Sequence, residues 1–179
     1  PNLGELEKKY WVECIDSTFV SSVGKNIDIF ENKFAQYLKA KRAVSTQSGT
    51  AALHLALYEL GIGPGDEVIV PVITFVATVN PIKYVGATPV FVDVDPETWN
   101  IDPKEIENHI TEKTKAIIPV HLYGNPCDMD KIMEISKKYN IPVIEDATES
   151  LGATYKGQFT GTFGELNAFS FNGNKIITT

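Results

Sequence analysis

Cysteine is scarce in this sequence, which has only Cys14 and Cys127 among its 179 residues. The two form neither a CxxC pair nor a spaced framework, so we expect free thiols in a reducing cytoplasm, without a disulfide scaffold or a metal site. Long apolar runs are also lacking: none approaches the ~20 residues that a membrane span requires, and no charged-then-apolar leader opens the sequence. We therefore expect a soluble, cytoplasmic protein with no membrane partner.

Clusters of basic residues are missing as well. The formal net charge is −7 and the isoelectric point is near 5.0, and the lysines and arginines do not gather in a block. This pattern argues against a nucleic-acid-binding or anionic-membrane-binding surface. A small anionic ligand remains compatible with the charge, because a few backbone N–H groups at a helix start can bind a phosphate.

Apolar residues are plentiful, and hydrophobic side chains make up 43% of the sequence. This content is enough for one sizeable domain with a core of its own. The sequence ends in the apolar run Lys175-Ile176-Ile177-Thr178-Thr179, with no turn residue or polar tail. We therefore expect it to be part of a longer protein.

The spacing of apolar residues predicts alternating helices and strands. One helix is expected within residues 1–25, and another is expected to begin after the capping residues Asn26 and Asp28 and to end near Ala40. Further helices are predicted over residues 50–60, 74–84, 103–109 and 128–139. Short apolar segments predict strands over residues 41–45, 67–70, 89–92, 116–120, 141–144 and 168–171.

These elements indicate an α/β fold. Strands that are short, apolar throughout and separated by helices are typical of a mostly parallel sheet covered by helices on both faces. Ligands of such sheets bind beyond the carboxyl ends of the strands. Candidate site residues are therefore sought directly after each strand and at the helix starts.

Two candidates have the chemistry of cofactor contacts. Ser48-Gly49-Thr50 precedes a predicted helix, where Gly49 allows close backbone approach and the free N–H groups suit a phosphate; the alternative is an ordinary helix cap. Asp146 ends an apolar strand, where a carboxylate needs a cation or hydrogen-bond donors, such as a protonated pyridine nitrogen. The alternative for Asp146 is a helix cap at the next turn.

Two further candidates are a lysine and an aromatic residue. Lys175 follows an aromatic-rich strand and a Gly/Asn turn, a setting that can desolvate the amine of a Schiff-base lysine; a lone lysine is otherwise a solvated surface residue. Phe75 follows another strand and could stack on a flat cofactor ring. The alternative for Phe75 is a core aromatic.

Taken together, these motifs resemble the DegT/DnrJ/EryC1/StrS family of sugar aminotransferases that depend on pyridoxal 5′-phosphate (PLP). The resemblance extends from Trp11 to Thr179. It is carried by Ser48-Gly49-Thr50-Ala51-Ala52-Leu53, Pro71-Val72-Ile73-Thr74-Phe75, Pro119-Val120-His121-Leu122-Tyr123-Gly124, Glu145-Asp146-Ala147 and Ser170-Phe171-Asn172-Gly173-Asn174-Lys175. It implies the large domain of the fold-type I aminotransferases, with a helical segment at residues 1–40, an incomplete PLP-binding domain at residues 41–179, and a C-terminal small domain that this chain lacks.

The resemblance also implies roles for individual residues. Lys175 matches the lysine that binds the cofactor and moves protons, and Asp146 matches the carboxylate that pairs with the pyridinium nitrogen. Phe75 matches the stacking ring. Asn172 stands where several relatives have His, and Glu149 stands where many have Gln near the cofactor phenolate oxygen. The phosphate cup is matched by Gly49, Thr50 and Ser170.

By the same resemblance, the substrate is a nucleotide-linked 4-keto-6-deoxy sugar, the amino donor is glutamate, and the unit is a homodimer. The subgroup that it resembles makes perosamine, bacillosamine-type and legionaminic-acid precursors for surface glycans. Alternatives are a 3-keto-sugar aminotransferase, a non-catalytic regulatory relative, and a sugar dehydratase of the same fold, which would have His in place of Lys175. A nicotinamide-binding domain is disfavoured because no GxGxxG motif follows a strand.

Overall fold

The computed structural model describes residues 2–178 of the chain. The chain divides into two compact units, Pro1–Ser45 and Thr46–Thr179, which are described separately here. All the predicted site residues belong to the second unit. Within residues 2–178, no helix is both long and apolar enough to cross a membrane.

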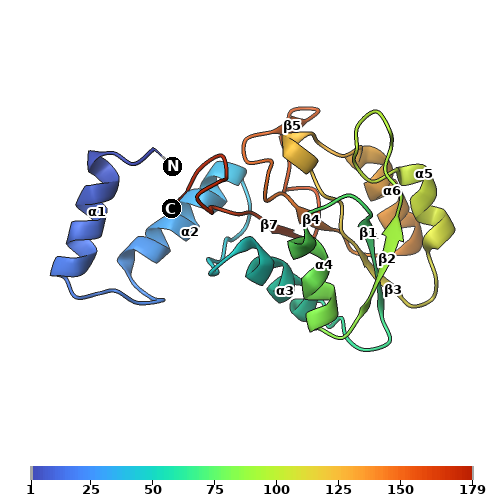
Figure 1. Ribbon diagram of the computed structural model, residues 1–179, viewed down its shortest axis with the longest axis horizontal. Helices are drawn as coiled ribbons and strands as arrows, with labels where there is room; N and C mark the ends of the chain where they lie inside the picture. The colour runs from blue at the N-terminus through green and yellow to red at the C-terminus, as the bar shows by residue number, and fades with distance from the viewer. Residues whose placement is uncertain (1, 179) are drawn as a thin grey trace. The chain divides into compact units, whose positions relative to one another are not determined.

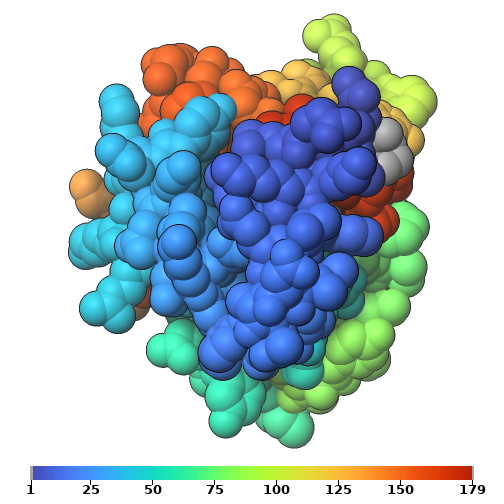
Figure 2. Space-filling view, turned by 90° about the vertical axis from the view of Figure 1, so that its left-hand side faces the viewer, coloured from blue at the N-terminus to red at the C-terminus, as the bar shows by residue number. Residues whose placement is uncertain are grey.

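The first unit contains two helices, α1 (Glu5–Asp16) and α2 (Lys25–Leu38). The predicted caps of the second helix were wrong: α2 begins at Lys25 after Gly24, whose φ of 146° is accessible to glycine. The Asn26 side chain instead donates a hydrogen bond to Cys14 Sγ at 3.0 Å. Figure 2 shows the side chains of this unit in shades of blue, α1 darkest.

The strand predicted at residues 41–45 is also absent, and the segment has no regular structure. Its last residue is held by a side chain rather than by a neighbouring strand, because Ser45 donates both its N–H and its hydroxyl to Glu31 Oε1, each at 2.7 Å. A carboxylate on α2 therefore takes the place of a strand partner.

The second unit is built on parallel strands, as predicted (Figure 1). Strands β1 (Glu67–Pro71), β2 (Thr88–Val92) and β3 (Thr114–Ile117) pair in the order β2-β1-β3, and β4 (Ile144–Asp146) pairs with β7 (Leu166–Ala168). Two parallel bridges, Ile117 to Val143 and Val120 to Asp146, join β3 to β4. Strands β5 (Thr154–Tyr155) and β6 (Gln158–Phe159) form a separate two-stranded antiparallel sheet.

Prolines explain why two strands are shorter than predicted. The segment expected at residues 116–120 breaks after Ile117, and the one expected at 141–144 becomes regular only at Ile144. Pro119 and Pro142 have no N–H to donate, yet their carbonyls accept from Asp146 and Ile117 at 2.9 and 3.1 Å. The pairing is therefore interrupted without leaving these acceptors unused. The last strand, expected at residues 168–171, lies earlier, at Leu166–Ala168.

Helices cover both faces of the sheet, as Figure 1 shows. Alternate residues of β1 point to opposite sides: Val68 and Val70 pack with α3 (Gly49–Glu59) and α4 (Val76–Tyr84). Ile69 packs in the opposite core with α5 (Pro103–Ile106) and α6 (Met129–Tyr139). The sheet is therefore packed between two apolar clusters, one on each face.

Two helices of the second unit depart by more than one residue from their predicted limits. The one expected at residues 74–84 starts at Val76, because Phe75 is extended, with φ −68° and ψ 139°. The one expected at 103–109 ends as α5 at Ile106 and continues as the 3₁₀ turn η1 (Glu107–His109). A second 3₁₀ turn, η2 (Leu122–Gly124), follows the bridge at Val120.

A buried polar cluster holds β4 in place. Glu145 Oε2 lies 2.9 Å from His121 Nε2, and His121 Nδ1 accepts from the Cys127 N–H at 3.1 Å, so Nε2 carries the proton. The same carboxylate accepts the N–H groups of Gly161, Phe163 and Gly164 at 2.6–2.7 Å. Burial, aided by the Glu145 and Asp146 carboxylates, raises the pKa of the Cys127 thiol far above its ordinary range, so this thiol stays protonated.

Candidate active site

The start of α3 meets the end of β7. A Cβ added to Gly49 would lie 2.9 Å from Thr148 Cγ2 and 3.2 Å from Ser170 Cβ, so these segments are in close contact. Ser48 does cap the helix, since its Oγ accepts from the Ala51 N–H at 3.2 Å. This cap uses the N–H group of Ala51 and not that of Gly49, the residue that lies beside Ser170.

Asp146 is buried at the carboxyl end of β4, only 3% exposed. Its Oδ2 accepts from the Thr78 hydroxyl at 2.6 Å, and its Oδ1 accepts from the Thr148 N–H at 3.2 Å. The Thr74 hydroxyl lies 2.7 Å from that of Thr78. Asp146 therefore caps a turn and not a helix, and within the described chain no basic side chain pairs with it. A buried carboxylate in this state suits a cationic ligand atom.

Lys175 is no solvated surface lysine. Its side chain is 16% exposed, and its Nζ lies 3.5 Å from Oε1 of Glu149, which is 27% exposed. The other carboxylate oxygen of Glu149 accepts from the Tyr123 N–H at 2.9 Å. The structure thus brings together Lys175 and Glu149, which are 26 residues apart in the sequence.

Two further predicted site residues, Phe75 and Asn172, are exposed. The Phe75 ring is 71% exposed, so it is not a core aromatic. It precedes α4, the helix that supplies Thr78 to Asp146. Asn172 is exposed and donates its side-chain amide to Asn174 Oδ1 at 3.0 Å. Its carbonyl accepts from the Lys175 N–H at 2.8 Å, so it contacts the lysine through the backbone.

The sequence interpretation missed Thr78 and Tyr123. Thr78 had a visible signal, because it follows Thr74 by four residues at a helix start, which places both hydroxyls on one side. Tyr123 contributes through its backbone and has a left-handed conformation, φ 53° and ψ 27°. Such a contribution leaves no mark in the side-chain pattern.

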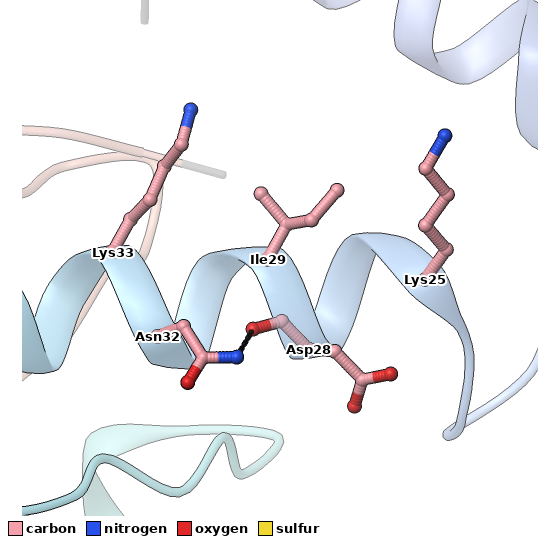
Figure 3. Close-up of a pocket in the computed structure, with 5 residues that line it drawn as sticks. All are labelled: Lys25, Asp28, Ile29, Asn32 and Lys33. Atoms are coloured by element: carbon pink, nitrogen blue, oxygen red, sulfur yellow. Dashed lines mark hydrogen bonds between the residues drawn. The ribbon is translucent and has the colours of Figure 1, made fainter.

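A shallow surface depression lies elsewhere, on α2, and is lined by Lys25, Asp28, Ile29, Asn32 and Lys33. Figure 3 shows Lys25, Ile29 and Lys33 extending from the same side of that helix. Its lining shares no residue with the site described above, so we assign the chemistry to the sheet edge.

Comparison with known proteins identifies the family of the chain. The DegT/DnrJ/EryC1/StrS aminotransferase family matches residues 1–179. The chain belongs to this family. It is 56% identical over 179 residues to the GDP-perosamine synthase of Escherichia coli O157:H7, covering 100% of this chain and 49% of the relative. It therefore spans about half the length of the curated relatives that it matches.

Solved structures of family members have the same fold. An aminotransferase from Psychrobacter cryohalolentis superposes with a TM-score of 0.96 at 44% identity, covering 99% of this chain and 45% of that one. NtdA from Bacillus subtilis, solved with bound cofactor PMP, gives a TM-score of 0.81 at 40% identity, covering 87% of this chain and 35% of that one. These likenesses confirm the predicted fold class.

Gly49→Ala tests the close contact at the start of α3. We expect it to lower the free energy of unfolding by about 1–3 kcal/mol, despite the better helix propensity of alanine, because the new methyl group collides with Thr148 and Ser170. PLP affinity should fall as well. Urea denaturation and absorbance titration measure the two effects. Gly63→Ala is the matched control, since its Cβ would find its nearest neighbour at 3.8 Å; equal effects of the two changes would contradict the assignment.

Proposed function

We propose that the full-length protein is a PLP-dependent sugar aminotransferase. It transfers an amino group, supplied by glutamate, to a nucleotide-linked 4-keto-6-deoxy sugar in the synthesis of surface glycan precursors. The observation that carries the proposal is Asp146: a buried carboxylate with two neutral donors and, within residues 2–178, no basic partner, at the same sheet edge as the α3 start. The likeness to GDP-perosamine synthase supports the substrate class.

The residues at this edge fit the three reactive parts of PLP. Gly49 and Thr50, at the start of α3, offer N–H groups for the phosphate, and Gly49 lies beside Ser170. Asp146 suits a protonated pyridine nitrogen, and Lys175 offers a largely buried amine for the aldehyde. The exposed Phe75 ring is free to stack on a flat ligand.

When bound, PLP supplies an electron sink for the bond-breaking step. The protein contributes position and proton transfer. Thr78 fixes Asp146, whose carboxylate would hold a protonated ring nitrogen. The amine of Lys175 would act on the proton at the α-carbon of the amino donor, first as a general base and then as a general acid.

Other functions of the same fold are disfavoured to different degrees. The presence of Lys175 argues against a dehydratase with His at this position. A regulatory relative without activity would have no need for both Lys175 and Asp146, and the fold keeps each of them partly or fully buried. Amination at C3 of the sugar needs the same residues, so a direct assay must separate it from amination at C4.

Lys175→Ala tests the covalent role of the lysine. We expect the full-length variant to fold, to bind PLP loosely and to lose transamination, because the amine that holds the cofactor is gone. Borohydride treatment and peptide mapping of the unchanged protein should find the cofactor on Lys175.

Asp146→Asn should fold and lose several orders of magnitude in rate. A tag on another lysine, or near-normal turnover of Asp146→Asn, would refute these roles.

The substrate class is tested with a panel of nucleotide-linked 3-keto and 4-keto sugars and glutamate as the donor. We expect turnover of a 4-keto-6-deoxy sugar, detected as 2-oxoglutarate release and as the aminated product by mass spectrometry. Turnover restricted to 3-keto sugars would show that the proposed substrate is wrong. If no sugar is turned over, the proposed function is wrong.

We also propose that the active unit is a homodimer with each site touched by both chains, as the resemblance to fold-type I enzymes implies. Light scattering of the full-length protein should give twice the chain mass. Mixing Lys175→Ala chains with chains altered at a partner-facing site residue should restore part of the activity. A fully active monomer would contradict the proposal.

A further inference from the structure

We propose that Gly161 is a positioning residue for the phosphate end of the site. Because it has no side chain, the Phe169 ring lies against its backbone, and this contact sets where Ser170 meets the start of α3. The inference rests on the proposed function, in which Ser170 and the start of α3 hold the phosphate of PLP. Gly161 acts through Phe169 and not on the cofactor directly.

Gly161 is required to be glycine for two separate reasons. Its φ of 75° lies in the left-handed region, which residues with a side chain disfavour. A Cβ added there would also overlap Phe169 Cζ, and it would lie 2.7 Å from Cε2 of that ring and 3.0 Å from Ala147 Cβ. The ring therefore packs directly on the backbone of Gly161, with Ala147 close beside it.

Hydrogen bonds fix the backbone of Gly161. Its N–H donates to Glu145 Oε2 at 2.7 Å, and the same buried carboxylate oxygen lies 2.9 Å from His121 Nε2. The preceding residue, Thr160, is buried, and its hydroxyl donates to the Ser150 carbonyl at 3.0 Å. Gly161 cannot move away from the ring without breaking these bonds, so its backbone sets the position of the ring.

Of the two neighbours of Gly161, Phe169 is the one that can give way. The Ala147 N–H donates to the Ala168 carbonyl at 2.9 Å, which ties Ala147 to β7. The parallel register of β4 with β7 ends at Asp146 and Ala168. Phe169 is the first residue beyond this pairing, so a group inserted at Gly161 displaces Phe169 before it displaces Ala147.

Movement of Phe169 reaches the start of α3 directly. A Cβ added to Gly49 would lie 3.2 Å from Ser170 Cβ and 3.5 Å from the Phe169 carbonyl oxygen, so both residues pack against the helix start. Through one aromatic ring, Gly161 therefore sets the spacing between Ser170 and the N–H groups of α3 that suit a phosphate.

The other end of the site has separate supports. Asp146 Oδ2 accepts from the Thr78 hydroxyl at 2.6 Å, and the Lys175 N–H donates to the Asn172 carbonyl at 2.8 Å. A change at Gly161 should therefore weaken the binding of the phosphate more than the binding of the pyridine ring and the aldehyde. Pyridoxal, which has the ring and the aldehyde but no phosphate, distinguishes the two effects.

The test compares the affinities for PLP and pyridoxal, each measured by absorbance titration of the cofactor-free full-length protein. Gly161→Ala should lower the ratio of PLP affinity to pyridoxal affinity about tenfold, because the methyl group displaces the Phe169 ring and with it Ser170. A merely structural role of Gly161 would weaken the binding of both ligands equally. The same change should have a smaller effect in a Phe169→Leu background, since the shorter side chain leaves room for the methyl group.

Gly157→Ala is the matched control. Gly157 has a φ of 84°, and among residues 2–178 no atom outside its chain neighbours would lie within 4 Å of an added Cβ. The control therefore introduces the same backbone strain without the ring contact, and its affinity ratio should match that of the unchanged protein. If Gly161→Ala does not fold, Phe169→Leu alone serves as the test, and its ratio should fall about threefold because the packing against Gly161 is lost.

Two results would overturn the inference while leaving the proposed function intact. One is an unchanged affinity ratio in Gly161→Ala, or in Phe169→Leu where it takes the place of that variant. The other is an equal change of the ratio in Gly161→Ala and Gly157→Ala. If borohydride does not fix PLP to Lys175 in the unchanged protein, the proposed function itself fails.

Discussion

The carboxylate of Glu145 lies fully buried, between the imidazole of His121 and the backbone of residues 161–164. A buried charge is tolerated only when its lone pairs are satisfied, and removing a partner from such a group costs about 3–5 kcal/mol. Here four donors from two separate segments converge on one side chain. The carboxylate therefore fixes the strand that carries it, and this strand ends at Asp146.

The two neighbouring carboxylates serve opposite faces of the sheet. Side chains alternate along β4, so Glu145 points to the side of Val143 and α6, whereas Asp146 points to the side of Ile144 and α4. The first is closed off by donors from the protein. The Asp146 carboxylate accepts from two neutral donors among residues 2–178 and lies at the sheet edge where Gly49 and Ser170 meet. Of these two adjacent residues, Glu145 stabilises the fold and Asp146 belongs to the candidate site.

Close approach shapes the rest of the site. Gly49 is held between Thr148 and Ser170 so tightly that a methyl group would collide with Thr148 Cγ2, at 2.9 Å, and crowd Ser170 Cβ, at 3.2 Å. This contact brings a helix start, the turn after β4 and the end of β7 to one place. Tyr123 adds a strained backbone donor from the loop after β3, so four segments distant in sequence define the surroundings of Lys175 and Asp146.

Local patterns in the sequence determined the helices and most strands of the parallel sheet, the α/β fold and the candidate residues Gly49, Asp146 and Lys175. They predicted a strand at residues 41–45 that is absent, and they did not predict the hairpin of β5 and β6. The features predicted correctly depend on residue type and short-range spacing, which a sequence displays directly. Tertiary structure alone decided that Ser45 binds Glu31 instead of a strand, that Thr78 holds Asp146, and that Glu149 joins Tyr123 to Lys175. These contacts link residues 14 to 68 positions apart, and their partners are chosen by packing and by hydrogen bonds that no local pattern records.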